Sequence, residues 1–210
     1  MTHLRKTLFT TAAAIALPLA AQAEVVLQIN SSLPEGSFAH VFLQEYESRL
    51  EAAAPGEIDV QIFMSNTLGS EEDVLQGLGL GTHHASLSAS AIAQINTRAA
   101  IFDLPYLFED RDAVQAFAAS PAGDMLREGF DGSGMVLAAM WDNGFRQITN
   151  AVRPITTPED LEGLKIRTPT NRQRVEMFNT LGANATPLSF GEVYSALDQG
   201  VIDGQENPAN

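Results

Sequence analysis

The sequence predicts an α/β fold with two lobes and mostly parallel sheets. Short strand patterns alternate with helical patterns from residue 25 onward, and this order is typical of parallel strands joined by helices. Gly and Pro mark the ends of most of these segments. A change of composition at 142–154 (DNGFRQITNAVRP) indicates a crossing between lobes, so we expect a first lobe at 24–145 and a second at 146–210.

The first 23 residues have the features of a secretory signal peptide. A basic start at Arg5 and Lys6 precedes an apolar run over 8–20, and Ala21-Gln22-Ala23 supplies a cleavage signature. The run is too short for a confident membrane span, and no later apolar run is long enough to cross a bilayer. We therefore expect residues 1–23 to be removed and the mature chain to be periplasmic and not membrane-spanning.

The composition excludes several classes of partner. The formal net charge is −14, so nucleic acid and anionic membrane surfaces are not expected to bind. There is no cysteine, and 45% of the residues are hydrophobic, so stability has to come from a packed core. Because the body is acidic, any site for an anion depends on a few arginines at short range.

The first lobe opens with a regular alternation of elements. Strands are predicted at 25–30 and 58–63 and around residue 87. Ser37 is the predicted N-cap of the first helix, and an S-x-x-D capping box at Ser70 opens the second. The first helix is expected to bury a stripe made of Phe38, Val41, Phe42, Tyr46 and Leu50.

The rest of the first lobe is predicted to contain two apolar segments separated by two short helices. The apolar segment 102–108 (FDLPYLF), broken by Pro105, is expected to be a buried connection. Two short helices follow, the second with Ser120 as cap and Pro121 at its first position. The apolar run 134–141 (GMVLAAMW) is expected to be a core strand.

The second lobe shows the same alternation. Thr157-Pro158 caps a helical turn before the strand LKIR, and a helix carrying Val175, Phe178 and Leu181 begins at Thr170 or Asn171. A further capping box at Ser189 opens the last helix, and VIDGQENP (201–208) gives a short strand and a turn.

Arg167 stands at the carboxyl end of the LKIR strand, and ligands of open α/β sheets bind beyond the carboxyl ends of strands. A guanidinium meets a carboxylate through two parallel hydrogen bonds, so Arg167 is a candidate carboxylate ligand. The alternative is an internal ion pair with Glu192, Asp198 or another acidic residue.

Several motifs together resemble a known family. WDNGFRQITN, GLKIRTP and LSFGEVYSALDQGVIDGQENP, preceded by LPEGSFAH, LGSEEDVLQGL and FDLPYLF, are similar to the extracytoplasmic solute-binding proteins of TRAP transporters, the DctP type. The resemblance implies the two-lobed periplasmic solute-binding fold, no catalysis, no cofactor, and delivery of an organic acid to TRAP membrane permease subunits. Family members usually continue well beyond Asn210, so we expect the C-terminal part of the fold to be missing here.

The resemblance also implies a set of ligand-binding residues. Arg167 would bind the carboxylate, Arg146, Phe190 and Asn207 would complete the pocket, and Asn30 would be a weaker contact. The implied ligand is a C4-dicarboxylate or a related carboxylate.

Three of these residues also have a structural explanation. Arg146 suits an ion pair between lobes, Phe190 a core contact at a helix start, and Asn207 the turn before Pro208. His83 and His84 are adjacent on a predicted strand and point to opposite faces, so no metal site is expected.

Two other functions stay open on the sequence alone. A periplasmic sensor module would need the same ligand-binding lobes as a transport protein. A secreted hydrolase or lyase would use Glu206 or a histidine as general base, although no partner for Glu206 is identifiable and a structural role is favoured.

Overall fold

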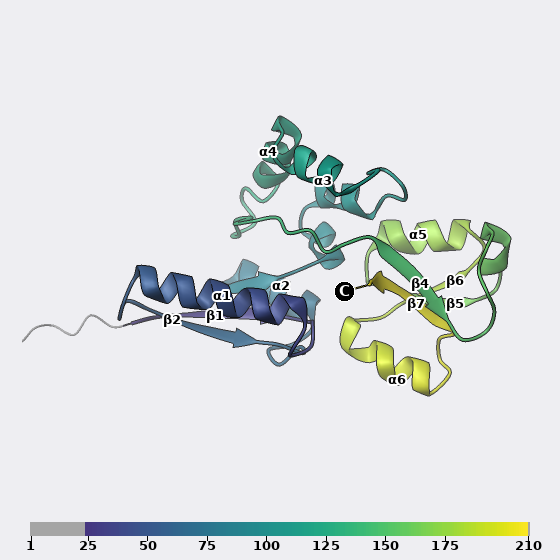
Figure 1. Cartoon of the computed structure of the whole chain (residues 1–210), viewed down its shortest axis with the longest axis horizontal. Coiled ribbons are helices and arrows are strands. Elements are labelled where there is room, and N and C mark those ends of the chain that lie inside the picture. Colours follow the sequence, from purple (N-terminus) through teal and green to yellow (C-terminus); the bar gives the residue numbers. More distant parts are fainter. Residues whose placement is uncertain (1–23, 210) are drawn as a thin grey trace, which may run out of the picture.

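The computed structural model describes residues 24–209, so the predicted signal peptide lies outside the described residues. The chain forms two separate sheets with helices packed on them (Figure 1). Four of the five strand pairs are parallel, which confirms the predicted α/β fold with mostly parallel sheets. The sheets use residues on either side of the expected division at 145, while the exact lobe boundary stays a prediction.

The first sheet has the strand order β2-β1-β3, and both pairs are parallel. The strands are β1 (Val25–Ser31), β2 (Ile58–Phe63) and β3 (Ala85–Leu87), all at the predicted places. Because parallel strands need a crossover, helix α1 (Phe38–Ala53) joins β1 to its neighbour β2, and α2 (Glu71–Leu80) leads from β2 to β3 on the other side of β1.

Both crossover helices begin at the predicted caps. The Ser37 hydroxyl accepts a hydrogen bond from the His40 backbone N–H at the start of α1. At the start of α2, Ser70 and Asp73 form the reciprocal capping box, which satisfies N–H groups that the helix leaves unpaired.

The predicted buried face of α1 is wrong. Ala39 and Leu43 are the buried residues, and Leu43 packs in a core with Ile29, Val60 and Met64. Leu50 packs against this core, but the other members of the predicted stripe are exposed: Phe38, Val41, Phe42 and Tyr46. The helix carries apolar residues on more than one face, so the spacing alone could not decide which face the sheet would cover.

The segment after β3 is built from short helical pieces. They are the 3₁₀ helices η1 (Ser90–Gln94) and η2 (Thr97–Asp103), followed by α3 (Arg111–Ala118) and α4 (Pro121–Glu128). The predicted pair of short helices is confirmed, including the Ser120 cap and Pro121 at the first position of α4.

Two apolar segments of this region are not buried as predicted. In 102–108, the rings of Phe102 and Phe108 pack with Phe117, while Leu104, Tyr106 and Leu107 are exposed. The run 134–141 forms no strand, and Val136 is 90% exposed. A strand needs a neighbour for its backbone hydrogen bonds, and no described strand pairs with this run, which connects α4 to β4 as irregular chain.

The second sheet has the strand order β4-β7-β5-β6. Its strands are β4 (Arg146–Asn150), β5 (Lys165–Thr168), β6 (Asn184–Pro187) and β7 (Gly204–Pro208). β5 runs parallel to β6 and β7, and β4 runs antiparallel to β7. The strand β5 was predicted, whereas β4 and β6 were not. A short strand followed by a turn was expected within 201–208, but the strand β7 itself occupies the expected turn, so Asn207 lies in a strand and the predicted turn before Pro208 is wrong.

The helices of the second sheet follow the predicted caps. They are η3 (Pro158–Leu161), α5 (Arg172–Thr180) after the N-cap Asn171, η4 (Phe190–Glu192) and α6 (Val193–Asp198). In Figure 1 the strands lie between α5 and α6. Ile166 and Phe178 are at the centre of the core beneath α5, together with Leu161, Leu164 and Ala183.

The carboxyl ends of the two sheets face each other. In Figure 1 the arrowheads of β2 and β7 point toward one another, and the end of β7 lies between the sheets. Since ligands of such sheets bind beyond the carboxyl ends of strands, this arrangement defines where a site is expected.

We predict opposite effects for two glycine substitutions in α2, the helix that begins at this edge. A Cβ on Gly77 would lie 2.0 Å from Cδ2 of the His83 ring, whereas a Cβ on Gly79 would make an ordinary contact at 3.5 Å with the Ser133 carbonyl oxygen. Gly77→Ala should lower the free energy of unfolding by about 1–3 kcal/mol through overpacking. Gly79→Ala should raise it by up to about 1 kcal/mol because alanine favours the helix. Thermal unfolding of both variants is the measurement, and stabilisation by Gly77→Ala would contradict the packing.

Candidate functional site

Arg167 lies near the carboxyl end of β5, on the face away from the core. Alternation along the strand puts Ile166 into the core under α5 and turns Arg167 to the opposite side. Its Cα pairs with Thr186 on β6 and Gln205 on β7, so the residue stands in the middle of the second sheet. Only 2% of Arg167 is exposed.

The Arg167 guanidinium has no carboxylate partner among the described residues. Its Nε and Nη2 donate to the Leu188 carbonyl oxygen at 2.9 and 2.6 Å, and its Cζ lies 5.9 Å from the centre of the Phe190 ring. The alternative ion pair with Glu192 or Asp198 is therefore wrong within these residues; Glu192 instead accepts from Ser189 in the cap of η4.

The surroundings of Arg167 act on its charge in opposite directions. Burial is the largest effect and lowers the pKa of Arg167 to about 10, while Glu206, Glu72 and Glu71 act to raise it. The guanidinium stays charged at neutral pH, and a buried charge without a counterion is costly. An added carboxylate would remove that cost.

Phe190 makes the core contact that the sequence analysis considered, and it also lies against Arg167. It packs against the small core of Val193, Ala196 and Ile202, as a residue at a helix start commonly does. Its ring also lies under the Arg167 guanidinium, an arrangement in which the ring face attracts the cation. Phe190 thus fixes the position of the free guanidinium.

Arg146 is held inside the second sheet. It forms an ion pair with Glu206, and its Nη2 donates to the Glu206 carbonyl oxygen at 2.8 Å and to Asn207 Oδ1 at 2.9 Å. β4 and β7 are neighbours in one sheet, so this ion pair does not join the two sheets. Two predicted ligand contacts, Arg146 and Asn207, are therefore hydrogen-bonded to each other.

Glu206 connects Arg146 to a second arginine that the sequence analysis missed. Arg174 Nη1 lies 3.0 Å from Glu206 Oε2, and another nitrogen of Arg174 pairs with Asp103 of the first half of the chain. Glu206 is 1% exposed, and guanidinium groups contact both its carboxylate oxygens. A carboxylate held in this way is not free to act as a general base.

Polar groups around Asp103 complete this network. Asn171 Nδ2 donates to Asp103 Oδ2 at 2.8 Å, and the Ser90 hydroxyl donates to Asp103 Oδ1 at 2.7 Å. The network is electrically balanced, with two arginines and two carboxylates. A signal for Arg174 existed in the sequence, because it lies four residues before the core residue Phe178 and so on the buried face of α5.

The first sheet presents two amide side chains at its carboxyl edge. Asn30, near the end of β1, is 1% exposed, and neither its Oδ1 nor its Nδ2 has a partner among the described residues. Asn66 follows β2 in a left-handed conformation, and its Oδ1 also lacks a partner. A Cβ on Gly191 would lie 2.6 Å from Asn66 Nδ2, so this amide lies directly against η4 and next to Phe190.

Glu71 and Glu72, in the first turn of α2, face the same region and were not among the predicted site residues. Glu72 accepts a hydrogen bond from the Thr170 hydroxyl, three residues after Arg167. Glu71 accepts from the Ala89 backbone N–H, and burial, assisted by repulsion from Glu72, raises the pKa of Glu71 to about 7. The capping box at Ser70 predicted the helix start that carries both residues.

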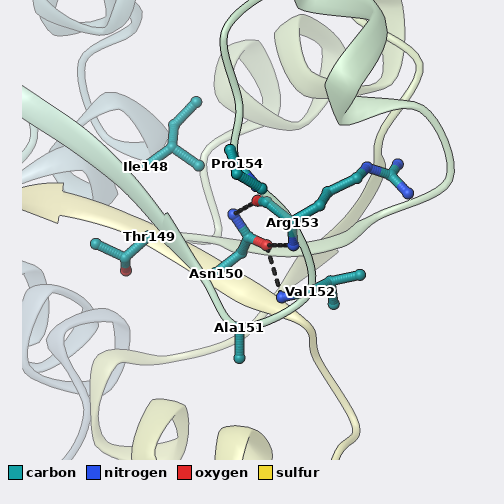
Figure 2. Close-up of a pocket in the computed structure, with 7 residues that line it drawn as sticks. All are labelled: Ile148, Thr149, Asn150, Ala151, Val152, Arg153 and Pro154. Carbon is teal, nitrogen blue, oxygen red and sulfur yellow. Dashed lines mark hydrogen bonds between the residues drawn. The ribbon is translucent and has the colours of Figure 1, made fainter.

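A surface hollow elsewhere in the second sheet is a less suitable site. It is lined by 148–154 at the turn after β4 (Figure 2). Asn150 accepts from the backbone N–H groups of Val152 and Arg153 and donates to the Arg153 carbonyl oxygen, so its side chain is used by the turn itself. The hollow is at the opposite end of β4 from Arg146.

Two negative findings concern residues 24–209 alone. No group of three His, Asp or Glu side chains in this range is placed to hold a metal ion. No helix in the same range is long and apolar enough to cross a bilayer.

Comparisons with known proteins agree on one family. The profile of "Bacterial extracellular solute-binding protein, family 7" matches residues 29–210. A solute-binding protein of Verminephrobacter eiseniae is 36% identical over 189 residues, which cover 90% of this chain and 56% of that protein.

Solved structures give the same result. A TRAP periplasmic solute-binding protein of Polaromonas sp. JS666, bound to D-erythronate, superposes with a TM-score of 0.84 at 32% identity, covering 88% of this chain and 61% of that one. Another from Sulfurospirillum deleyianum, with bound succinate, gives a TM-score of 0.84 at 30% identity, covering 89% and 61%. The chain therefore spans less than two thirds of the proteins it matches.

We predict that the ion network between the two halves contributes strongly to stability. Arg174→Ala leaves Glu206 and Asp103 buried with fewer counterions, which should cost about 3–5 kcal/mol of unfolding free energy. The control is Arg172→Ala in the same helix, whose pair with Glu176 is exposed and should contribute less than about 1 kcal/mol. Urea unfolding of the two variants measures the difference, and equal shifts in midpoint would contradict the assigned role of Arg174.

Proposed function

Because the chain belongs to the bacterial extracellular solute-binding proteins of family 7, we propose that it binds a small organic acid between its two sheets, through Arg167. In this proposal the protein performs no chemistry on its ligand. It is exported to the periplasm and delivers the acid to the membrane permease of a TRAP transporter.

The observation that carries the proposal is the state of Arg167. Its guanidinium is buried beside the carboxyl ends of the strands, is held by one carbonyl oxygen and one aromatic ring, and has no carboxylate partner in the described part of the chain. A bidentate carboxylate would supply both the missing charge and two charge-assisted hydrogen bonds. No other arginine at this edge is in the same state, since Arg146 and Arg174 are paired with Glu206 and Asp103.

Among the other proposed site residues, Phe190 and Asn30 keep the roles first expected, whereas Arg146 takes a different one. Phe190 supports the guanidinium and offers an apolar surface to the carbon skeleton of the ligand. Asn30 offers an amide with both atoms free for a ligand oxygen. Arg146 acts through others: it holds Glu206 and orients Asn207, whose amide would reach the ligand from β7.

The proposal that the protein delivers its ligand to a permease rests on the related proteins and not on the geometry of the site. The superposed proteins from Polaromonas and Sulfurospirillum are periplasmic proteins of TRAP systems, and each was solved with a small carboxylate bound. A transport role requires uptake of the bound acid to depend on both this protein and a permease in the same cell. Loss of uptake after deletion of either gene is the expected result.

We predict that the charge of Arg167 alone is not sufficient for binding. Arg167→Ala should weaken binding of the cognate acid by about 2–5 kcal/mol. Arg167→Lys should also bind poorly, because an ammonium cannot reproduce the planar fork. Calorimetric titration of the whole protein, including any sequence that continues this chain, is the measurement. Arg153→Lys, an exposed arginine that bonds backbone carbonyls, is the matched control and should bind normally. Unchanged affinity in both Arg167 variants would end the proposal.

We predict that affinity for the acid rises as the pH falls from about 8 to about 6. Glu71 has a pKa raised to about 7, so it is ionised above this range and neutral below it. Its ionised form repels a carboxylate at Arg167, and such repulsion at a partly buried site changes affinity by about threefold to tenfold. Arg167 does not titrate in this range, and Glu71→Gln should remove the pH dependence. A wild-type affinity that is flat between pH 6 and 8 would contradict the placement of Glu71 beside the ligand.

A further inference from the structure

We infer that the ligand is a monocarboxylate carrying several hydroxyl groups, an acid of the aldonate type, rather than a dicarboxylate. The carboxylate binds Arg167, and the hydroxyl groups bind Glu71 and Glu72 together with the amides of Asn30 and Asn66. This inference rests on the proposed function and specifies its ligand. It differs from the C4-dicarboxylate that the resemblance implied.

The charge balance around Arg167 favours a ligand with a single carboxylate. Arg146 and Arg174 are balanced by Glu206 and Asp103, so neither supplies free positive charge. Among the described residues at this edge, Arg167 is the one guanidinium without a carboxylate partner. A second carboxylate on the ligand would have no cation of its own there.

The acidic residues at the start of α2 oppose a second carboxylate directly. Glu71 and Glu72 both act to raise the pKa of Arg167, so their charges would also act on an acid bound there. Glu72 also bonds the hydroxyl of Thr170, on the connection that follows Arg167. Glu72, and Glu71 in its ionised form, repel a further carboxylate at short range, whereas both side chains accept hydrogen bonds from hydroxyl groups.

The unpaired amide atoms of Asn30 and Asn66 favour a ligand that carries hydroxyl groups. Asn30 is fully buried with a free donor and a free acceptor, and Asn66 has a free acceptor beside η4. Buried polar groups are paired in nearly all native structures, so these atoms need partners that both donate and accept. A hydroxyl group does both, whereas a carboxylate only accepts and an aliphatic chain does neither.

The test is a calorimetric titration of the whole protein with two matched sets of acids. The four-carbon set is D-erythronate, meso-tartrate, succinate and butyrate, and the six-carbon set is D-galactonate, galactarate, adipate and hexanoate. Within a set the members differ in the second carboxylate or in the hydroxyl groups while the chain length stays the same. In the set of the fitting length, the hydroxylated monocarboxylate should bind at least about 100-fold more tightly than each of the other three.

Each outcome separates this inference from the proposed function. Binding of a dicarboxylate as tightly as the hydroxylated monocarboxylate would overturn the inference and leave carboxylate binding at Arg167 intact. Equal binding of butyrate or hexanoate would overturn the role of the hydroxyl groups. Failure of all eight acids to bind would overturn the inference and the proposed function together.

A variant tests the physical cause. Glu72→Gln keeps a hydrogen-bond acceptor for Thr170 but removes one negative charge, so the preference for galactonate over galactarate, or for erythronate over tartrate, should fall about tenfold. Glu128→Gln, an exposed acid at the end of α4, is the control and should leave the preference unchanged. Circular dichroism verifies that both variants are folded. An unchanged preference in Glu72→Gln would show that charge at α2 does not select the ligand.

Discussion

The buried guanidinium of Arg167 is the constraint on which the rest of the site depends. Its position follows from alternation in a four-residue strand, since Ile166 has to enter the core beneath α5 and Arg167 must then face the other way. Leu188 and Phe190 hold the group in place without neutralising it. The chain has a formal net charge of −14 and many carboxylates, yet none of the described ones pairs with Arg167; in the proposed site, the ligand carboxylate would supply that partner.

The ion network beside Arg167 explains why this one arginine stays free. Glu206 is the acidic residue best placed to neutralise it, and its electrostatic influence is the largest of those that raise the pKa of Arg167. Arg146 and Arg174 occupy both oxygens of that carboxylate, so Glu206 is already committed. In the proposed site, Arg146 and Arg174 would thus leave Arg167 available for the ligand carboxylate. The cost of burying four charges is offset by their mutual contacts and by the bonds of Asn171 and Ser90 to Asp103.

Local signals in the sequence predicted most helices and strands correctly. The contacts between segments that are distant along the chain could not be predicted from these signals. The capping boxes at Ser70 and Ser189 and the strands at 25–30, 58–63 and LKIR depend on neighbouring residues, and all are present. The strand predicted at 134–141 was wrong because a strand needs a neighbouring strand, and the local sequence does not show whether one is available. Arg167 was predicted as a ligand residue from its place on a strand and from the family resemblance, and its buried position beside the ends of the strands is consistent with that prediction. Arg174 was missed because its partners, Asp103 and Glu206, are 71 and 32 residues away along the chain.

The segment that follows Arg167 also makes most of the polar contacts between the two halves. Thr170 bonds Glu72 and Gln94, Asn171 bonds Ser90 and Asp103, and Arg174 pairs with Asp103. A ligand carboxylate at Arg167 would thus bind directly before residues 170–174, which make these contacts between the two halves. Hydroxyl groups reaching Glu72 would extend this set of contacts across the two halves, whereas a second carboxylate there would oppose it. In the proposed complex, the charges near Arg167 and the contacts between the two halves would therefore both favour a hydroxylated monocarboxylate.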